Sequence, residues 1–168
     1  MFQSKYKVKE SSTKKAYNYL INLIAKRDYS EYKLREKLRL KGYESSHIDE
    51  SIQKLIDDGY LREDFYTDAR IRGLMSKNYS PSHIKRSLEQ EKIYVDESYI
   101  LSIFGDNYTS VDDQVDYLVS KKIGSKPIPE GREEFYKFKN KIITFIVSKG
   151  HSFSAASDAF NRYLDKTD

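Results

Sequence analysis

The chain contains no cysteine and only three prolines and seven glycines among its 168 residues. Without cysteine it can form neither a disulfide framework nor a thiolate metal site, and this absence is consistent with a reducing compartment. No hydrophobic run approaches the length that spans a membrane, and residues 1–12 have lysines but no apolar run that would act as a secretory signal. We therefore expect a cytoplasmic protein without a membrane segment, whose residues 1–12 form a flexible basic N-terminal arm.

Hydrophobic residues make up 38% of the chain and charged residues 33%. With so few prolines and glycines, this balance is typical of an elongated helical protein with thin cores. A deep, enclosed active site is not expected in such a protein. No segment alternates apolar and polar residues for long enough to require a sheet. The predicted fold class is therefore all-α.

One segment, residues 27–42, defines the unit from which the chain is built. Ser30 can accept hydrogen bonds from the first amides of a helix, and Gly42 permits the left-handed backbone with which helices commonly end. Leu34 and Leu38 lie one turn apart, so they share one face and predict a single buried stripe. The remaining helix surface is mainly basic.

This unit occurs again later in the chain. Residues 77–80 (Lys-Asn-Tyr-Ser) align with residues 27–30 (Arg-Asp-Tyr-Ser), and residues 149–152 (Lys-Gly-His-Ser) begin a fainter third copy. Ile84 and Leu88, then Ala156 and Phe160, take the two apolar positions. An internal repeat of this length predicts an array of similar helical units. We expect three tandem three-helix repeats in an elongated, curved array.

Helix boundaries follow from serine caps, glycine exits and apolar periodicity. The first repeat is predicted over 13–61, the second over 62–107 and the third over 108–168, with a loop near 124–131. The first three expected helices extend over 14–27, 31–41 and 46–59, the third with a Ser46 to Asp49 capping box. A fourth helix is expected to be capped by Asp64, with Phe65, Ala69 and either Leu74 or Met75 facing inward. Further helices are expected to begin at Pro81, near Asp96 and at Val111, followed by a helix over 133–150 and a last helix with Ala155 and Leu164 on its apolar face.

Motifs that carry catalytic chemistry are missing. The sequence has no glycine-rich phosphate loop, no dinucleotide fingerprint and no His-Glu-x-x-His spacing, and its three histidines, His47, His83 and His151, lie in different repeats. His151 takes the place of tyrosine in the other copies of the turn, which favours a structural role between helices. We therefore expect no catalytic residues, no metal site, no cofactor and no enzymatic activity.

The net charge of +4 conceals an alternation along the chain. Residues 1–41 carry +8, 42–68 carry −6, 69–93 carry +4, 94–120 carry −6 and 121–168 carry +4. The basic blocks contain the repeated unit. They could solubilise the array through salt bridges, or bind an acidic protein or a phosphate backbone. Candidate binding residues are the cations of the predicted helices: Lys33, Arg35, Lys37, Arg39, Arg70, Arg72, Lys85 and Arg86.

The chain combines a serine-capped helix with Leu34-Arg35-Glu36-Lys37-Leu38, a Lys41-Gly42 exit, and a Gly-Tyr-Leu turn at 59–61 before an Asp-Phe start at 64–65. In this combination the sequence resembles the RecX family of RecA regulators. The resemblance extends over about Lys14 to Leu164. Departures are Glu63 where Asn or Asp is usual, Tyr66 where Ala is usual, and a shortened stretch at 75–78.

The resemblance implies a monomeric, non-enzymatic regulator that binds the RecA recombinase, both free and in the groove of its filament. It further implies inhibition of strand exchange and of coupled ATP hydrolysis. The alternative is a helical protein that binds single- or double-stranded DNA without sequence preference and without a recombinase partner. Acidic residues at the starts of the predicted helices argue against base-specific DNA reading.

Overall fold

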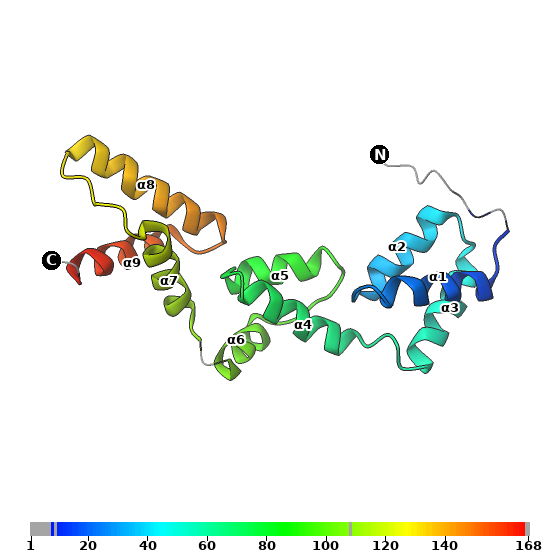
Figure 1. Ribbon diagram of the computed structural model, residues 1–168. Helices are drawn as coiled ribbons and strands as arrows, with labels where there is room; N and C mark the ends of the chain where they lie inside the picture. Colours follow the sequence, from blue (N-terminus) through cyan, green and yellow to red (C-terminus); the bar gives the residue numbers. More distant parts are fainter. Residues whose placement is uncertain (1–7, 9, 108, 167–168) are drawn as a thin grey trace. The chain divides into compact units, whose positions relative to one another are not determined.

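The structure is a computed structural model that describes residues 8, 10–107 and 109–166. Regular structure in this part of the chain is entirely α-helical, which confirms the predicted fold class. The helices, labelled in Figure 1, are α1 (Thr13–Ile24), α2 (Glu31–Lys41), α3 (Ser45–Asp57), α4 (Glu63–Met75), α5 (Pro81–Glu89), α6 (Glu97–Asp106), α7 (Val111–Ile123), α8 (Arg132–Ser148) and α9 (Phe153–Asp165).

Serine side chains begin the helices that the repeat predicts. The Ser30 Oγ atom accepts a hydrogen bond from the Lys33 amide at 3.4 Å, and Ser80 Oγ accepts one from the His83 amide at 3.2 Å. In the third copy, Ser152 Oγ accepts a bond from an amide of the first turn of α9 at 3.1 Å. Each of these caps satisfies an amide that the helix itself leaves unpaired, which stabilises the helix by about 1 kcal/mol.

The predicted capping box at Ser46 was wrong. Helix α3 begins one residue earlier, with Glu44 at the cap position and no side-chain cap bond. The carboxylate of Asp49, which would have completed the box, instead accepts a hydrogen bond from Arg35 of α2 at 2.5 Å. An interhelical ion pair therefore replaces a local capping interaction.

The inward face predicted for α4 was also wrong at its start. Phe65 is 59% exposed and Ala69 is exposed, whereas Thr67, Ile71 and Leu74 are buried. The Thr67 hydroxyl donates to the Glu63 carbonyl at 2.7 Å, so this polar side chain can be buried without an unpaired donor. The first half of the buried stripe of α4 is thus offset by two residues from the predicted one, whereas Leu74 and Met75 are buried as predicted.

The helices form two compact units. Unit 1 comprises the described residues up to Ala69 together with Glu91–Ile93, and unit 2 comprises Arg70–Gln90 and the described residues from Tyr94 onward. Helix α4 contributes its first half to unit 1 and its second half to unit 2. The division of the chain into repeats 13–61, 62–107 and 108–168 stays a prediction.

In unit 1, α3 packs against both α1 and α2 (Figure 1). The core of this bundle is formed by the apolar stripes of the three helices, with Leu61 and the first tyrosine of the repeated turn: Ala16, Leu20, Tyr29, Leu34, Leu38, Ile48, Ile52, Leu55 and Leu61. Each fully buried leucine or isoleucine contributes about 1.5–3 kcal/mol through removal of its apolar surface from water.

Part of the predicted N-terminal arm contacts unit 1. The Val8 amide donates to the Lys41 carbonyl at 2.8 Å, and Ser11 Oγ accepts from the Glu44 amide at 3.0 Å and lies 2.7 Å from His47 Nδ1. Residues 1–7 and 9, also predicted to belong to a flexible arm, lie outside the described residues.

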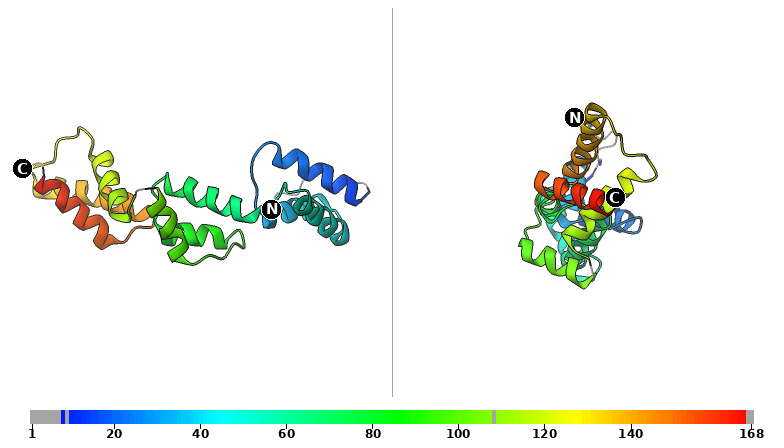
Figure 2. Two further views of the ribbon diagram at one scale, coloured as in Figure 1. Left: turned by 90° about the horizontal axis from the view of Figure 1, so that it is seen from below. Right: turned by 90° about the vertical axis from the view of Figure 1, so that its left-hand side faces the viewer.

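In unit 2, α9 packs against α7 and α8, and α5 packs against α6. Both views of Figure 2 show α7, α8 and α9 side by side. Ala156 and Phe160, the apolar pair of the third sequence copy, are fully buried as predicted. Helix α9 contacts both other helices of its bundle, as α3 does in unit 1. In sequence, the third copy aligns with α2 and α5. Its helix, α9, is nevertheless the third helix of its bundle.

The second and third copies of the turn pack directly against each other in unit 2. The Ser80 amide donates to the Lys149 carbonyl at 3.0 Å, and Ser80 Oγ lies 2.8 Å from the Gly150 carbonyl oxygen, to which it donates. Gly150 has a φ of +92°, and a Cβ atom there would lie 2.5 Å from Ser80 Oγ. His151 is 4% exposed, and its Nε2 atom lies 3.0 Å from the Asn78 carbonyl oxygen. These contacts confirm the predicted structural role of His151.

Candidate interaction surface

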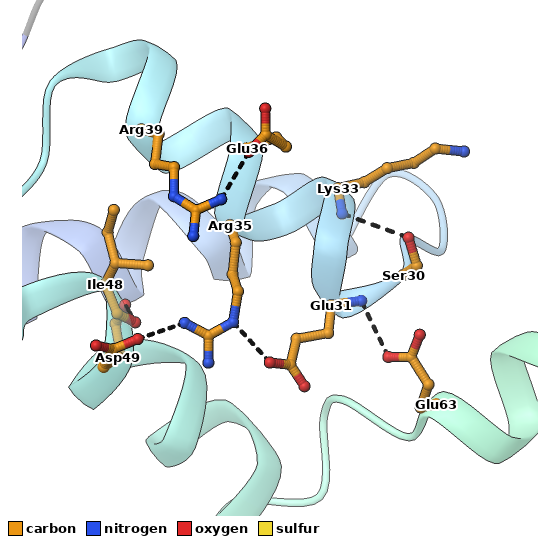
Figure 3. Close-up of polar contacts among 10 residues, drawn as sticks. Ser30, Glu31, Lys33, Arg35, Glu36, Arg39, Ile48, Asp49 and Glu63 are labelled. Atoms are coloured by element: carbon orange, nitrogen blue, oxygen red, sulfur yellow. Dashed lines mark hydrogen bonds and ion pairs between the residues drawn. The ribbon is translucent and has the colours of Figure 1, made fainter. Parts of the chain in front are cut away.

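Three of the four candidate cations on α2, namely Lys33, Arg35 and Arg39, form ion pairs within unit 1. Arg35 Nε donates to Glu31 at 2.6 Å, and Nη1 of the same guanidinium donates to Asp49 at 2.5 Å. Arg39 Nη1 lies 2.7 Å from Glu36. Figure 3 shows both arginines beside these carboxylates, with Arg35 joining α2 to α3. Because its guanidinium bridges two acids, Arg35 holds the two helices together.

Lys33 is paired with a buried carboxylate. Its ammonium forms an ion pair with Glu91, whose side chain is only 4% exposed. The Tyr66 hydroxyl also donates to Glu91, at 2.6 Å. Removing one partner of such a pair leaves a buried charge uncompensated, which is costly. The geometry therefore gives Lys33 a structural role in unit 1.

A second, half-buried acid lies at the start of α4. Glu63 Oε2 accepts a hydrogen bond from the Glu31 amide at 3.1 Å, at the positive end of α2 (Figure 3). Burial raises the pKa of Glu63 above its ordinary value, and this effect exceeds the opposing effect of the amide hydrogen bond. Carboxylates as well as a lysine ammonium therefore lie near the start of α2.

Lys37 belongs to a different environment. Its ammonium lies 5.1 Å from the centre of the Tyr29 ring, and the Arg27 guanidinium lies 4.6 Å from the same ring. A hydrogen bond from Arg27, together with the charges of Lys37 and Lys26, lowers the pKa of the Tyr29 hydroxyl even though burial opposes this shift. We call Lys26, Arg27 and Lys37 the cation cluster. Among the described residues, none of the three pairs with a carboxylate.

The four α2 candidates therefore do not form one basic face. At 100° per residue, Lys33 and Lys37 lie on one border of the buried stripe, and Arg35 and Arg39 lie on the other. The structure brings Lys37 together with Lys26 and Arg27, which the candidate list omitted.

A signal for Arg27 was present in the sequence. The first position of the repeated turn is basic in every copy, as Arg27, Lys77 or Lys149. In the third copy, the Lys149 ammonium lies 4.3 Å from the centre of the Tyr79 ring. A cation over a tyrosine ring thus recurs at these turns. Each such contact contributes roughly 0.5–1 kcal/mol to stability when it is exposed.

The other four candidates belong to unit 2. Arg70 and Lys85 are half-buried, whereas Arg72 and Arg86 are exposed. Arg70 and Arg72 are two residues apart on α4, so they project from different sides of the helix. The Arg86 Nε atom lies 3.4 Å from the Ser82 carbonyl oxygen of its own helix.

A pocket of about 380 Å³ lies beside the cation cluster in unit 1. Its lining is mainly aromatic and aliphatic, with Asp28 and Arg62 as its charged members. The apolar lining, which we call the aromatic pocket, consists of Ile24, Tyr29, Tyr60, Leu61, Phe65 and Tyr66. Tyr29 therefore lines the pocket and also lies against the cation cluster.

Comparison with known proteins places this architecture in a family. The model of the first three-helix domain of RecX matches residues 16–55, which extend over α1, α2 and most of α3. The regulatory protein RecX of Haemophilus ducreyi is 32% identical over 137 residues, a match covering 80% of this chain and 83% of that protein. The chain belongs to the RecX family.

Other RecX proteins show partial or distant similarity. The regulatory protein RecX of Vibrio cholerae is 32% identical over 72 residues, or 43% of this chain, and this match spans about half of that relative (47%). The crystal structure of RecX from Lactobacillus salivarius has a TM-score of 0.66, with 24% identity over 91% of this chain and 96% of that chain. At this identity, the RecX crystal structure supports the shared fold alone.

Neither a membrane-spanning helix nor a metal site is found in the described part of the chain. None of the described helices is long and apolar enough to cross a membrane. In the same part of the chain, no group of three or more histidine, aspartate or glutamate side chains could hold a metal ion.

Proposed function

We propose that this chain regulates the RecA recombinase. It binds RecA, both free and in the groove of the filament, and mainly inhibits strand exchange and coupled ATP hydrolysis during DNA repair, recombination and the SOS response. The observation that carries this proposal is the 32% identity to a regulatory protein RecX over most of both chains. Regulation by binding requires neither a catalytic group nor a cofactor. The regulator that we propose is a cytoplasmic monomer.

Charge supports this proposal physically. Lys26, Arg27 and Lys37 have no carboxylate partner among the described residues, so binding an acidic surface would not first require an internal ion pair to break. Arg35, in contrast, would have to leave two acids. Complementary charge also speeds association, because it steers the encounter between partners. The cation cluster is therefore the first surface to test.

The first prediction concerns inhibition of the recombinase. We expect substoichiometric amounts of the protein to slow ATP hydrolysis by RecA of the same organism on single-stranded DNA. The double substitution Arg27→Glu and Lys37→Glu should weaken this inhibition about tenfold, since it replaces two attractive charges with repulsive ones. Lys126→Glu, which reverses an exposed charge in the loop before α8, is the matched control and should inhibit like the unmodified protein.

Two results would contradict the proposal. Unchanged inhibition by a folded double variant would exclude the cation cluster as the binding surface. No inhibition by the unmodified protein in excess would exclude the recombinase as the partner.

The cation cluster also favours a second candidate function, non-specific DNA binding without a recombinase partner. Affinity for DNA that falls steeply as salt increases, with no effect on RecA, would support this candidate.

A further inference from the structure

We propose that the aromatic pocket of unit 1 binds an acidic peptide segment of a partner protein. One bulky apolar side chain of this segment enters the pocket, and carboxylates beside it contact the cation cluster. The inference rests on the proposed function in one respect, namely that the chain acts by binding another protein. It adds the site and the chemistry of the segment that is bound.

The pocket has the size and lining of an anchor site. Its volume of about 380 Å³ lies at the low end of the range found for ligand pockets, and aromatic side chains dominate its wall. Tyr60 and Phe65 are 61% and 59% exposed, although exposing a large apolar side chain to water costs free energy. Interfaces concentrate their binding energy in such pockets, which a single aromatic or aliphatic side chain fills.

The second observation concerns Arg62 and Phe65. The Arg62 guanidinium lies 3.6 Å from the centre of the Phe65 ring, and it also lies 3.3 Å from Asp64. The guanidinium keeps its charge in water while it covers part of the ring. Phe65 thus presents an apolar surface to the pocket beside an arginine that is already paired with Asp64, an arrangement suited to an apolar side chain.

The charges around the pocket are unequal on its two sides. The turn between α1 and α2 contributes Lys26 and Arg27, and Lys37 of α2 joins them at Tyr29. On the second side, at the end of α3, Asp57 and Asp58 come directly before the lining residue Gly59, and Arg62 of the following connection is paired with Asp64. An occupant should therefore be negative at the first side and neutral or positive at the second.

This inequality favours a peptide over nucleic acid. A nucleic-acid strand carries one phosphate per nucleotide, so a strand crossing the pocket would also meet the carboxylates on the acidic side. Asp28 lies in the pocket lining itself, and Asp64 pairs with the lining residue Arg62. A peptide can confine its carboxylates to the side of the cation cluster, and so avoids this repulsion.

The prediction is tested by titrating the isotope-labelled full chain with synthetic probes and following its backbone amides by NMR. The main probe is a short peptide of aspartate and glutamate with one central phenylalanine. A second peptide has serine in place of this phenylalanine, and a third probe is an oligothymidylate. We expect the phenylalanine peptide to shift amides around Tyr29, Tyr60 and Phe65, and the serine peptide to bind about tenfold more weakly.

Variants separate the two parts of the site. Phe65→Ala should weaken binding of the phenylalanine peptide about tenfold, and Arg27→Glu with Lys37→Glu should weaken binding of both peptides. The matched control for the aromatic change is Tyr94→Ala, which removes an exposed tyrosine of unit 2 and should leave binding unchanged. Because Phe65 and Tyr94 are both exposed, thermal unfolding should show that both variants fold.

Three results would overturn the inference. These are no amide shifts with either peptide, equal binding to the unmodified chain and to Phe65→Ala, or tighter binding of the oligothymidylate at the same amides. The ATPase assay distinguishes this failure from failure of the proposed function. Inhibition of the recombinase without peptide binding rejects the pocket alone, whereas peptide binding without inhibition rejects the recombinase and retains the pocket.

Discussion

Single residues carry most of the chemistry that differs between copies of the repeated turn. Tyr29 and Tyr79 take a position that His151 takes in the third copy. The sequence predicts a structural role for His151, because a turn position inside a repeat has to pack against its neighbours. It does not predict the bond to the Asn78 carbonyl, because that carbonyl belongs to the second copy and reaches His151 only in the folded unit.

The second prediction concerns the charge of His151. A carbonyl oxygen can only accept, so His151 Nε2 carries a hydrogen, and the other ring nitrogen is buried without a hydrogen-bond partner among the described residues. Burial lowers the pKa of His151 below its ordinary value of 6.5. His151 therefore contributes stability to unit 2 above pH 6.5, and this contribution is lost as the pH falls through the folded pKa.

An NMR titration of the imidazole resonances checks this prediction. We expect the midpoint for His151 to lie below 6.5, and urea unfolding to show lower stability at pH 5 than at pH 7. His151→Gln keeps a donor for the Asn78 carbonyl but cannot titrate, so it should weaken the pH dependence. A midpoint at or above 6.5, or an equally strong pH dependence in the variant, would contradict the prediction.

Elements were predictable where local chemistry decides them. Serine caps begin α2, α5 and α9 at the predicted residues, because the cap and the amides that it satisfies are neighbours in sequence. The start of α3 was not predictable, since the Asp49 carboxylate pairs with Arg35 of another helix and therefore does not cap α3. Phe65 was misplaced for a related reason, because an apolar residue was assumed to be buried although Arg62 covers its ring.

The third prediction compares two serine caps. Ser30 and Ser80 each accept a hydrogen bond from an amide three residues ahead. Ser80 Oγ also donates to the carbonyl of Gly150, which lies in the connection between α8 and α9. Ser30→Ala should cost about 1 kcal/mol, the usual value of a cap. Ser80→Ala should cost about 2 kcal/mol, because a second hydrogen bond is lost with the cap.

Native-state hydrogen exchange measures these costs separately in the two units. We expect Ser80→Ala to raise exchange in α5 and also in the first turn of α9, where Gly150 and Ser152 precede the helix. Ser30→Ala should raise exchange in α2 without affecting α9. Equal costs for the two variants, or an effect of Ser80→Ala confined to α5, would show that the bond to Gly150 contributes nothing.

For the whole molecule, the repeats predicted the fold class, and the family membership agrees with the resemblance seen in the sequence. The two compact units were not predicted. Their boundary lies inside α4, and Glu91–Ile93 belong to unit 1 although they follow α5. The decisive contacts join Glu91 to Lys33 and Tyr66 across wide gaps in sequence. Apolar periodicity describes single helices and therefore contains no information about such pairs.

The same pairs decide how the candidate binding residues should be interpreted. Lys33 and Arg39 are both cations of α2, and reversing either charge could weaken partner binding by removing a contact or by loosening the fold. Lys33 neutralises a buried acid, whereas Arg39 pairs with the half-exposed Glu36. Unfolding free energy and inhibition therefore have to be measured on the same variants.

The last prediction separates the two roles. Lys33→Ala should lower the unfolding free energy by roughly 1–3 kcal/mol, less than a fully buried pair because the lysine side chain is 40% exposed. Adding Glu91→Gln should restore most of this loss, since it removes the buried charge. Arg39→Ala, the matched control, should cost less than about 1 kcal/mol. Urea unfolding measures all three values.

Inhibition of the recombinase then shows whether Lys33 also contacts the partner. If its role is structural, Lys33→Ala weakens inhibition and Glu91→Gln restores inhibition together with stability. If Lys33 contacts the partner, the double variant is stable but still inhibits poorly. We expect the first result. If the Lys33 ammonium left Glu91 to contact an acid of the partner, the buried Glu91 carboxylate would have no counter-charge, and this is costly. The cation cluster has no such carboxylate to abandon, and so it can contact an acidic partner without loosening unit 1.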